Sequence, residues 1–452
     1  MNKTIAAIST GQAPGGIGVI RVSGPEAFSI CERVFRPKLG RKLSEMSGYT
    51  AALGEVWSGT KLDDCVALVF RGPKSYTGED VVELSCHGGR YVTRQVLAEV
   101  LKCGAAPAGP GEFTKRAFFN GKLDLAQAES VMEIISAQGR NSMLAAQAAG
   151  SGMLSKRIGN ICERLEGLAA HLAAWSDFPE EVDLIDIGEV AISLGICKEE
   201  LSQLLKGFDQ GKIFREGLRT VITGRPNVGK STLMNLLAGR ERSIVTPYPG
   251  TTRDVVEELI SLAGVPLMLA DTAGLRHTED PVECIGVESA RRCLKNAELV
   301  LAVFDWSNEL MEEDFKLIES IRELPVIAIV NKCDLEQRID LDFIVSNFRY
   351  YVTISAARNI GFDSLELAFN KFIGAENFDA GQAELFTERQ RAAALAAKSA
   401  VEQGGEAIKQ GLTLDAVTVC IEDALNALFQ LTGRRVSDEI IDQVFERFCV
   451  GK

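Results

Sequence analysis

The stretch Gly224-Arg-Pro-Asn-Val-Gly-Lys230-Ser231 has the spacing of a phosphate-binding loop. In such a loop the backbone N–H groups surround the phosphates, the lysine reaches the β- and γ-phosphate oxygens, and the serine hydroxyl binds Mg²⁺. Two further motifs follow, Asp271-Thr-Ala-Gly274 and Asn331-Lys-Cys-Asp334. An aspartate in the last motif can accept from N1–H and the amino group of guanine, whereas adenine lacks this pair of donors. The three motifs together predict a domain that binds and hydrolyses GTP.

Short apolar runs around these motifs predict a parallel α/β sheet. Arg219–Thr223 reads as a strand that enters the phosphate loop, and Ser231–Ala238 reads as the helix that leaves it. This order places the phosphates at a helix N-terminus and at the carboxyl edge of the sheet. Further buried strands are expected at Pro266–Ala270, Leu299–Phe304 and Val326–Val330.

We expect the GTP contacts to come from the three motifs, from the segment between the first two, and from Ser355-Ala356, whose backbone N–H groups can meet the guanine O6. The predicted GTP-binding residues are Asn227, Val228, Gly229, Lys230, Ser231, Thr232, Thr246, Thr251, Thr252, Asp271, Thr272, Ala273, Gly274, Asn331, Lys332, Asp334, Ser355 and Ala356.

The bulk composition is that of a soluble cytoplasmic protein. The 452 residues suggest about three domains, and 46% apolar with 25% charged residues is ordinary for a globular chain. We expect no membrane span and no signal peptide. Eleven cysteines without a C-x-x-C pair indicate free thiols in a reducing compartment rather than a zinc site. With a net charge of −13, any contact with RNA must use local basic patches.

The texture of the sequence changes along the chain. Residues 1–120 are rich in short strand patterns, at Ile17–Val22, Thr50–Val56, Asp64–Phe70 and Val81–Cys86. Helical patterns run from Leu123 to a break at Asp177-Phe-Pro-Glu180, from Ile187 to Phe208, and from Glu384 to Phe448.

Because neither helical stretch can cover its own apolar face, we expect one discontinuous helical domain into which the nucleotide domain is inserted. Two separate helical hairpins are the alternative. The predicted fold class is therefore a combination of α/β and α+β domains, with an N-terminal domain at 1–120, helical parts at 121–215 and 378–452, and a GTPase domain at 216–377.

Several blocks outside the nucleotide motifs resemble the MnmE/TrmE family of tRNA-modification GTPases over essentially the full chain. They are Gly15-Gly-Ile-Gly-Val-Ile-Arg-Val-Ser23, Ser75-Tyr-Thr-Gly-Glu-Asp80, His87-Gly-Gly89, Pro110-Gly-Glu-Phe113, Lys122-Leu-Asp-Leu-Ala-Gln127 and the terminal Phe448-Cys-Val-Gly-Lys452.

This resemblance implies a homodimer built on N-terminal domains that bind a tetrahydrofolate, as the 5-formyl or 5,10-methylene derivative. It also implies a heterotetramer with an FAD- and NADH-dependent flavoprotein of the MnmG/GidA type. Such a pair adds an aminomethyl or carboxymethylaminomethyl group to C5 of the wobble uridine of certain tRNAs, with folate providing the one-carbon unit.

Two other functions remain open at this point. A ribosome-assembly GTPase would act as an RNA-binding switch without group transfer, but residues 378–452 lack the Gly-x-x-Gly loop of a KH module. A folate-dependent transferase with a regulatory nucleotide domain would transfer its one-carbon unit without the flavoprotein.

The catalytic apparatus for hydrolysis differs from that of Ras. Leu275 stands where a Ras-like enzyme has the glutamine that orients water, so another group must do this. The resemblance implies K⁺ in place of an arginine finger, Mg²⁺ bound by Ser231 and Thr252, and Glu283 as the catalytic residue, which orients the attacking water through a bridging water. The K⁺ ligands it implies are Asn227, Thr246, Tyr248 and Thr251. Pro247 and Pro249 stiffen the same loop, but they remove N–H donors and not carbonyl oxygens.

The folate contacts of the family correspond to Arg21, Glu83, Lys122 and Lys452, and the resemblance implies that the C-terminal tail with Lys452 folds back toward the folate site. A carboxylate can accept from the pterin N–H and amino groups, and the cations can meet the anionic glutamyl tail. Taken singly, each charge is more often a surface or ion-pair residue. Glu79 and Asp80 compete with Glu83 for the acidic role, and only the block match favours Glu83.

The last residues suggest a second catalytic group. Asp438–Phe448 is an amphipathic run that we expect to anchor a helix and to leave a short mobile tail, with Gly451 giving the tail freedom. Most free cysteines pack in cores, but Cys449 lies beyond this helix. Lys452 can favour its thiolate, which can add to C6 of a uridine or assist the one-carbon unit. We therefore predict that Cys449 serves the modification chemistry and not GTP hydrolysis.

Overall fold

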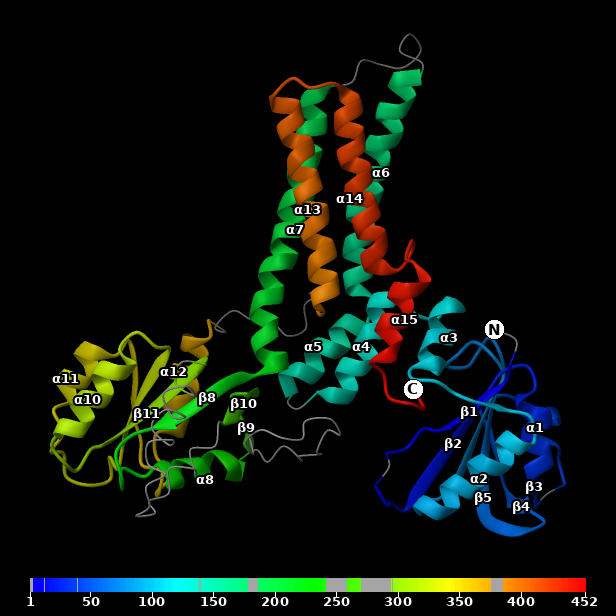
Figure 1. The fold of residues 1–452 in the computed structure, drawn as a ribbon, viewed down its shortest axis with the longest axis horizontal. Coiled ribbons are helices and arrows are strands. Elements are labelled where there is room, and N and C mark those ends of the chain that lie inside the picture. Colours follow the sequence, from blue (N-terminus) through cyan, green and yellow to red (C-terminus); the bar gives the residue numbers. More distant parts are fainter. Residues whose placement is uncertain are drawn as a thin grey trace, which may run out of the picture. The chain divides into compact units, whose positions relative to one another are not determined.

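The computed structural model describes residues 3–11, 13–38, 40–137, 140–177, 186–240, 258–269, 294, 296–374 and 385–452. The chain divides into two compact units. The first comprises Met1–Met132, Leu154–Cys197 and Ala392–Lys452, and the second comprises Glu133–Met153 and Lys198–Arg391. Figure 1 shows the elements coloured along the chain.

The first unit contains a seven-stranded sheet with the strand order β3-β4-β5-β6-β2-β1-β7. Its neighbouring strands are antiparallel, except that β7 runs parallel to β1. The four strand patterns predicted in this part of the chain are confirmed. The strands are β1 (Ile5–Ile8), β2 (Ile17–Ser23), β3 (Phe35–Pro37), β4 (Thr50–Ser58), β5 (Thr60–Phe70), β6 (Val81–His87) and β7 (Ala106–Pro107).

Three helices pack on this sheet: α1 (Ala27–Val34), α2 (Arg90–Lys102) and α3 (Glu112–Phe119). They were not predicted, because residues 1–120 were described only by their strand patterns. On β5 the alternate residues Cys65, Ala67 and Val69 are buried on the face that α1 and α2 cover. On α3, Phe113 is fully buried against Ile5 of β1 in a separate small cluster. The apolar residues at every second position of the strands therefore pack against these helices.

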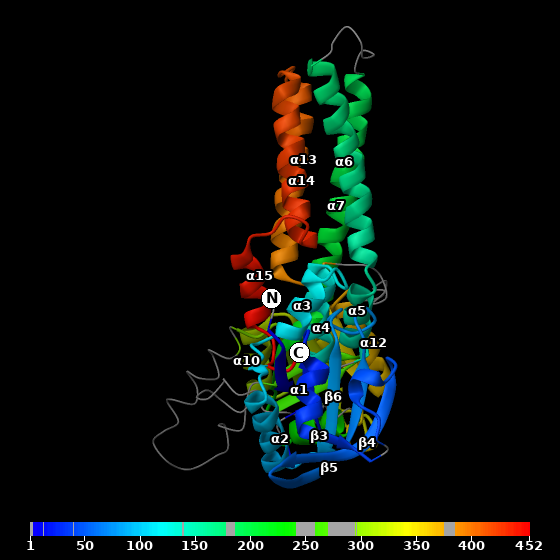
Figure 2. The same ribbon diagram turned by 90° about the vertical axis from the view of Figure 1, so that its right-hand side faces the viewer.

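The remaining helices of the first unit come from both ends of the chain. They are α4 (Leu125–Ser136), α6 (Met153–Asp177), the start of α7 (Ile187–Glu216), α13 (Glu388–Lys409), α14 (Leu414–Thr432) and α15 (Asp438–Glu446). Figures 1 and 2 show α6, α7, α13 and α14 running side by side. A Cβ on Gly404 of α13 would lie 3.3 Å from Cys420 of α14 and 3.4 Å from Leu194 of α7. The helices before and after the nucleotide motifs thus pack together, which confirms the discontinuous helical domain.

The second unit is built on a six-stranded sheet with the order β13-β12-β11-β8-β10-β9. Its strands are β8 (Leu218–Thr223), β9 (Glu258–Leu262), β10 (Val265–Leu269), β11 (Leu299–Asp305), β12 (Val326–Asn331) and β13 (Tyr350–Thr353). Five strands are parallel to one another, as the predicted α/β sheet requires, and β9, which was not among the predicted strands, pairs with β10 in the antiparallel sense. Ala263 and Gly264 both have positive φ, as a two-residue hairpin turn requires.

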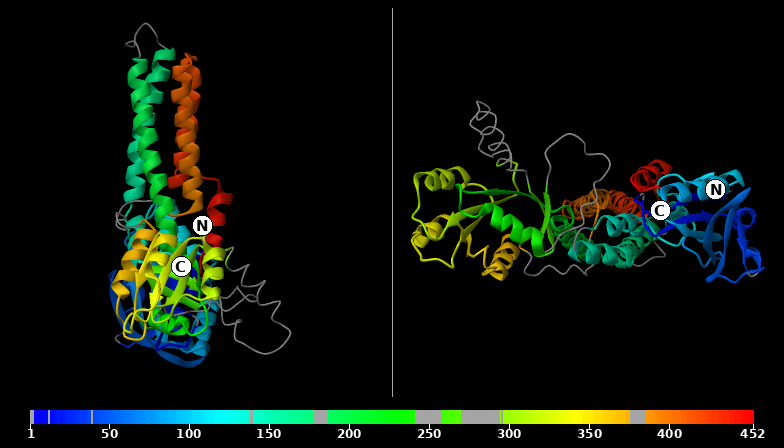
Figure 3. Two further views of the ribbon diagram at one scale, coloured as in Figure 1. Left: turned by 90° about the vertical axis from the view of Figure 1, so that its left-hand side faces the viewer. Right: turned by 90° about the horizontal axis from the view of Figure 1, so that it is seen from below.

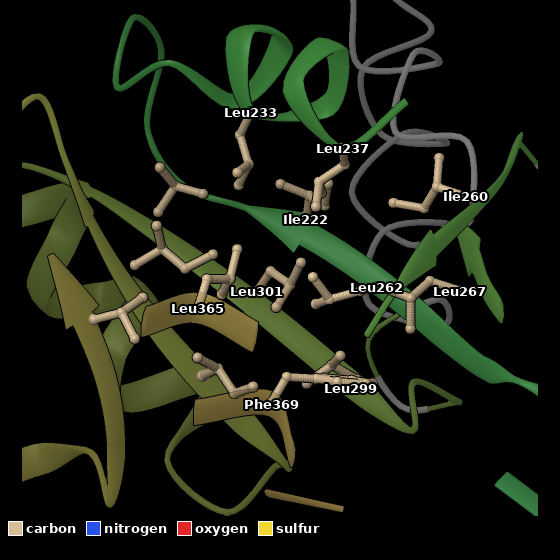
Figure 4. Packing of buried hydrophobic residues seen from close by; sticks show 14 of the residues in the cluster. Ile222, Leu233, Leu237, Ile260, Leu262, Leu267, Leu299, Leu301, Leu365 and Phe369 are labelled. Carbon is tan, nitrogen blue, oxygen red and sulfur yellow. The ribbon is translucent and has the colours of Figure 1, made fainter. Parts of the chain in front are cut away.

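Helices cover both faces of this sheet, and Figure 3 shows the unit from two further sides. On one face α8 (Lys230–Arg240) and α12 (Phe362–Phe372) pack on the strands, and Figure 4 shows Leu233 and Leu237 meeting Ile222 there. On the other face α10 (Glu312–Ile321) and α11 (Leu341–Asn347) cover alternate residues of the same strands. The central strands are buried on both sides, as their continuous apolar runs predict. α5 (Arg140–Gly150) belongs to this unit as well.

Candidate nucleotide and modification sites

The phosphate loop joins β8 to α8 and has the backbone that its glycines permit. Gly224 has a φ of +149°, and a Cβ there would lie 2.4 Å from the Val303 carbonyl oxygen of β11. Lys230 Nζ donates hydrogen bonds to the carbonyl oxygens of Gly224 at 2.7 Å and Arg225 at 2.8 Å. Burial lowers the pKa of Lys230. The lysine is thereby held under its own loop, at the N-terminus of α8.

The Asn331-Lys332 pair ties three loops together at the carboxyl ends of the parallel strands. Asn331 is buried, and its amide donates to the Val228 carbonyl oxygen at 2.9 Å and accepts from the Ala356 N–H at 2.9 Å. Lys332 Nζ donates to the Asn227 carbonyl oxygen at 2.7 Å. The structure thus brings the first and third motifs and the Ser355-Ala356 loop to one edge of the sheet.

The backbone N–H groups that were predicted to contact the guanine base already donate hydrogen bonds within the chain. The Ser355 N–H donates to the Ile360 carbonyl oxygen at 3.0 Å, and the Ala356 N–H donates to Asn331. A hydrogen bond from either N–H to guanine O6 therefore has to share that donor. Arg358 Nε lies 3.9 Å from the Asp334 carboxylate. Ser231 and Thr232 are exposed in the first turn of α8.

The predicted residues between β8 and β11 that complete the nucleotide, Mg²⁺ and K⁺ sites lie outside the described residues. They are Thr246, Tyr248, Thr251, Thr252, Asp271, Thr272, Ala273, Gly274 and Glu283.

One residue of this edge, Asp305 at the end of β11, belongs to none of the sequence motifs. One of its carboxylate oxygens accepts from the N–H and hydroxyl of Ser307 at 2.9 and 2.7 Å, and the other accepts from Asn308 at 2.9 Å and Lys332 Nζ at 2.6 Å. Burial favours the neutral acid, but the hydrogen bonds from Lys332, Ser307 and Asn308 outweigh it and lower the pKa of Asp305 to about 2. An Asp-x-Ser-Asn run directly after a buried strand is the sequence signal for such a turn.

A second group of predicted residues lies on the sheet of the first unit. Arg21 on β2 and Glu83 on β6 are directly opposite each other, with Arg21 Nε 2.7 Å from Glu83 Oε1. The Arg21 guanidinium lies 5.4 Å from the ring centroid of Tyr76 and 5.5 Å from that of Phe113. Lys122 Nζ donates to the Pro73 carbonyl oxygen at 3.1 Å. The predicted cations and carboxylate therefore border on the loop of residues 71–80.

The competing acids in this loop have partners of their own. Glu79 accepts from Ser23 Oγ at 2.7 Å and pairs with Arg116, whose side chain is 4% exposed. Asp80 accepts from the Gly72 N–H at 3.0 Å. A carboxylate committed to a buried arginine is a structural group, so Glu79 is the weaker candidate for ligand binding.

The C-terminal residues are docked on the same unit, and the expectation of a mobile tail was wrong. The Gly111 N–H donates to the Cys449 carbonyl oxygen at 3.3 Å, the Phe113 N–H to that of Lys452 at 3.1 Å, and Ser9 Oγ to that of Gly451 at 3.0 Å. Gly451 has a φ of +99°, and a Cβ there would lie 2.2 Å from the Ile8 carbonyl oxygen. The glycine is required for close approach and not for freedom, while Cys449 stays exposed.

These observations first define a class. A phosphate loop and a guanine-type motif joined at the carboxyl edge of a doubly covered α/β sheet form a GTPase domain, here in a chain that also carries a β-rich domain and a helical domain. Among the described residues, no helix is both long and apolar enough to cross a membrane.

Comparisons with known proteins then identify the family. Residues 4–122 match the family described as GTP-binding protein TrmE N-terminus, and residues 125–449 match the MnmE helical domain. The tRNA modification GTPase MnmE of Symbiobacterium thermophilum is 45% identical and is aligned over 100% of this chain and 99% of its own. The MnmE of Desulforamulus reducens is 41% identical and is aligned over 100% of both chains. The MnmE of Bacillus subtilis is 40% identical and is aligned over 99% of this chain and 100% of its own. The chain belongs to the MnmE family of tRNA modification GTPases.

Solved structures give a partial match. A crystal structure of Era from Aquifex aeolicus with bound GDP and aluminium fluoride is 27% identical and covers 40% of this chain and 66% of its own, with a TM-score of 0.28.

Proposed function

We propose that the chain is a K⁺-dependent GTPase that works with an FAD- and NADH-dependent flavoprotein on tRNA. Together they add an aminomethyl or carboxymethylaminomethyl group to C5 of the wobble uridine, with a tetrahydrofolate derivative as the one-carbon donor and ammonium or glycine, respectively, as the source of the amine. Because tRNA is the substrate, we place the reaction in the cytoplasm. The chain acts as a homodimer that forms a heterotetramer with the flavoprotein.

One observation carries the modification half of this proposal. The Phe113 N–H binds the Lys452 carbonyl oxygen, while the Phe113 ring lies beside the Arg21 guanidinium that pairs with Glu83. The backbone of the last residues, with the exposed Cys449, is therefore linked through one residue to the ion pair expected to bind folate. Residues from the two ends of the chain converge where a folate and a reactive thiol would have to meet.

The proposed folate contacts follow from the charges at this place. Glu83 would accept from the pterin N–H and amino groups, and Arg21, Lys122 and Lys452 would meet the anionic glutamyl tail. The Cys449 thiolate would add to C6 of the uridine or assist the one-carbon unit. Tetrahydrofolate supplies the one-carbon unit when bound.

The proposed hydrolysis mechanism depends on Asn227. Its φ of +66° is a left-handed conformation that Asn tolerates better than most residues, and it lies in the exposed part of the phosphate loop. The Asn227 amide oxygen would bind K⁺ together with Thr246, Tyr248 and Thr251, while Ser231 and Thr252 would bind Mg²⁺. Glu283 would orient the attacking water. The positive charge of K⁺ would stabilise the phosphate oxygens of the transition state as an arginine finger does.

Two assays test the proposal. GTP hydrolysis is measured in K⁺ and in Na⁺ at equal ionic strength, and we expect much faster hydrolysis in K⁺; equal rates would refute the cation mechanism. Modification of tRNA is then measured with GTP and a folate donor, with and without the flavoprotein. Product without the flavoprotein would indicate an independent folate-dependent transferase, and hydrolysis without any product would favour an RNA-binding switch.

A further inference from the structure

The place where β11 and β12 end contains a buried acid that no nucleotide motif includes. Asp305 is 5% exposed and lies directly opposite Asn331 in the register of the two strands. The next residue, Trp306, continues this pairing, because its N–H donates to the Asn331 carbonyl oxygen at 2.8 Å. Asp305 is therefore fixed beside Asn331, the first residue of the Asn331-Lys-Cys-Asp334 motif, which we call the guanine motif.

Asp305 acts on the next residue of that motif. Its Oδ2 lies 2.6 Å from Lys332 Nζ, and the same ammonium donates to the Asn227 carbonyl oxygen of the phosphate loop at 2.7 Å. The Lys332 backbone has a φ of +70°, which is uncommon for a residue with a side chain. The aliphatic stem of Lys332 consequently spans from the guanine motif to the phosphate loop.

A bound nucleotide has to cover the same span, with its base at Asp334 and its phosphates in the loop. The extended Lys332 stem is then a flat apolar surface beside the nucleoside, provided that its ammonium stays held at the far end. Without a carboxylate at this position the ammonium loses its charged acceptor among the described residues and is left with neutral oxygens such as the Asn227 carbonyl. A lysine side chain released in this way populates many rotamers, and ordering it again beside the nucleotide costs conformational entropy.

We propose that Asp305 is a positioning residue for guanine-nucleotide binding, which acts by holding the Lys332 ammonium against the phosphate loop. The inference depends on the GTPase activity of the family and is independent of potassium, folate and the flavoprotein. In this proposal Asp305 acts only through Lys332 and makes no contact of its own with the base or the phosphates.

The test is the affinity of the full-length chain for fluorescent mant-GDP, measured for Asp305→Asn, for Lys332→Met and for the double variant. Asn keeps the size of the side chain and removes its charge. We expect Asp305→Asn to weaken binding ~10- to 100-fold, the range for a lost hydrogen bond between charged groups. The double variant is expected to bind as Lys332→Met alone does, because Asp305 has no second route to the nucleotide.

The matched control is Asp340→Asn, the same chemical change at the N-cap of α11, where Asn serves equally well as a cap. Its affinity should stay within about twofold of the wild-type value. Circular dichroism and thermal unfolding without nucleotide establish that each variant is folded. Wild-type affinity in a folded Asp305→Asn would overturn the proposal, and so would independent, multiplying losses in the double variant. A wild-type chain that failed to bind mant-GDP would contradict the GTPase assignment, and this inference with it.

Discussion

At the scale of single residues, charged pairs decide which groups are available for a ligand. Arg116 is buried and shared between Glu79 and Glu112, at 3.0 and 2.9 Å, so all three side chains are committed to holding α3 against the loop of residues 71–80. Arg21 and Glu83 form a single contact at 2.7 Å, with side chains that are 18% and 19% exposed. A planar guanidinium with one bonded edge retains donors for an incoming anion. Arg21 and Glu83 are therefore better suited than Arg116, Glu79 and Glu112 to bind a ligand in place of each other.

The prediction at this scale concerns Glu83. Glu83→Ala should weaken the binding of 5-formyltetrahydrofolate by about tenfold or more, because the pterin loses a charged acceptor. Isothermal titration calorimetry on the wild-type chain and the variant measures this. Asp64→Ala is the matched control, since Asp64 lies on the neighbouring strand β5 and pairs only with Lys38 and Lys61 among the ion pairs of the described chain. Unchanged affinity in Glu83→Ala would remove Glu83 from the folate site.

At the scale of elements, the last helix and the tail depend on contacts with α3. Phe445 and Phe448 pack in one cluster with Phe118 of α3 and Leu125 of α4. A Cβ on Gly111, at the start of α3, would lie 2.8 Å from the Phe448 side chain. These close contacts direct the chain after α15 onto the edge formed by Pro110, which forms a β-bridge with Val450. The tail is thus held by an isolated β-bridge and is not a free end.

Replacing Gly451 tests this docking. Gly451→Ala places a methyl group on the Ile8 carbonyl oxygen and strains a positive φ, so the tail should detach. We expect faster hydrogen exchange at the amides of Gly111 and Phe113, and folate affinity lowered together with it. Gly411→Ala is the control, because Gly411 has a similar φ of +70° with no atom within 4 Å of the added Cβ. Unchanged exchange at Phe113 would show that the tail tolerates the methyl group and that its close approach is not required.

At the scale of the whole molecule, local patterns predicted the elements and long-range contacts completed the sites. The strands β8, β10, β11 and β12 and the phosphate loop follow from apolar runs and a motif that are each local in sequence. The docking of the tail joins Ser9 to Gly451, which are 442 residues apart, and no local pattern encodes such a pairing. The Asp-x-Ser-Asn run marks a turn at Asp305, but the contact with Lys332, which directly follows the next strand, is long-range and has no local signal. The antiparallel β9 was not predicted because Glu258-Leu-Ile-Ser-Leu262 does not alternate strictly between polar and apolar residues.

The division into two units yields the last prediction, a separation of two activities in one variant. The phosphate loop lies in the second unit, whereas Cys449 lies in the first and is exposed beside Gly111. Cys449→Ser keeps the backbone hydrogen bond to Gly111 and the size of the side chain, but a hydroxyl is a far weaker nucleophile than a thiolate. We therefore expect near-normal K⁺-stimulated GTP hydrolysis and a collapse of tRNA modification, measured by mass spectrometry of digested tRNA from the reconstituted reaction.

Cys103→Ser, the same change at the end of α2, should preserve both activities. If Cys449→Ser modified tRNA at the wild-type rate, the thiol would have no chemical role, and the tail would serve only to complete the folate site through the backbone of Gly451 and Lys452.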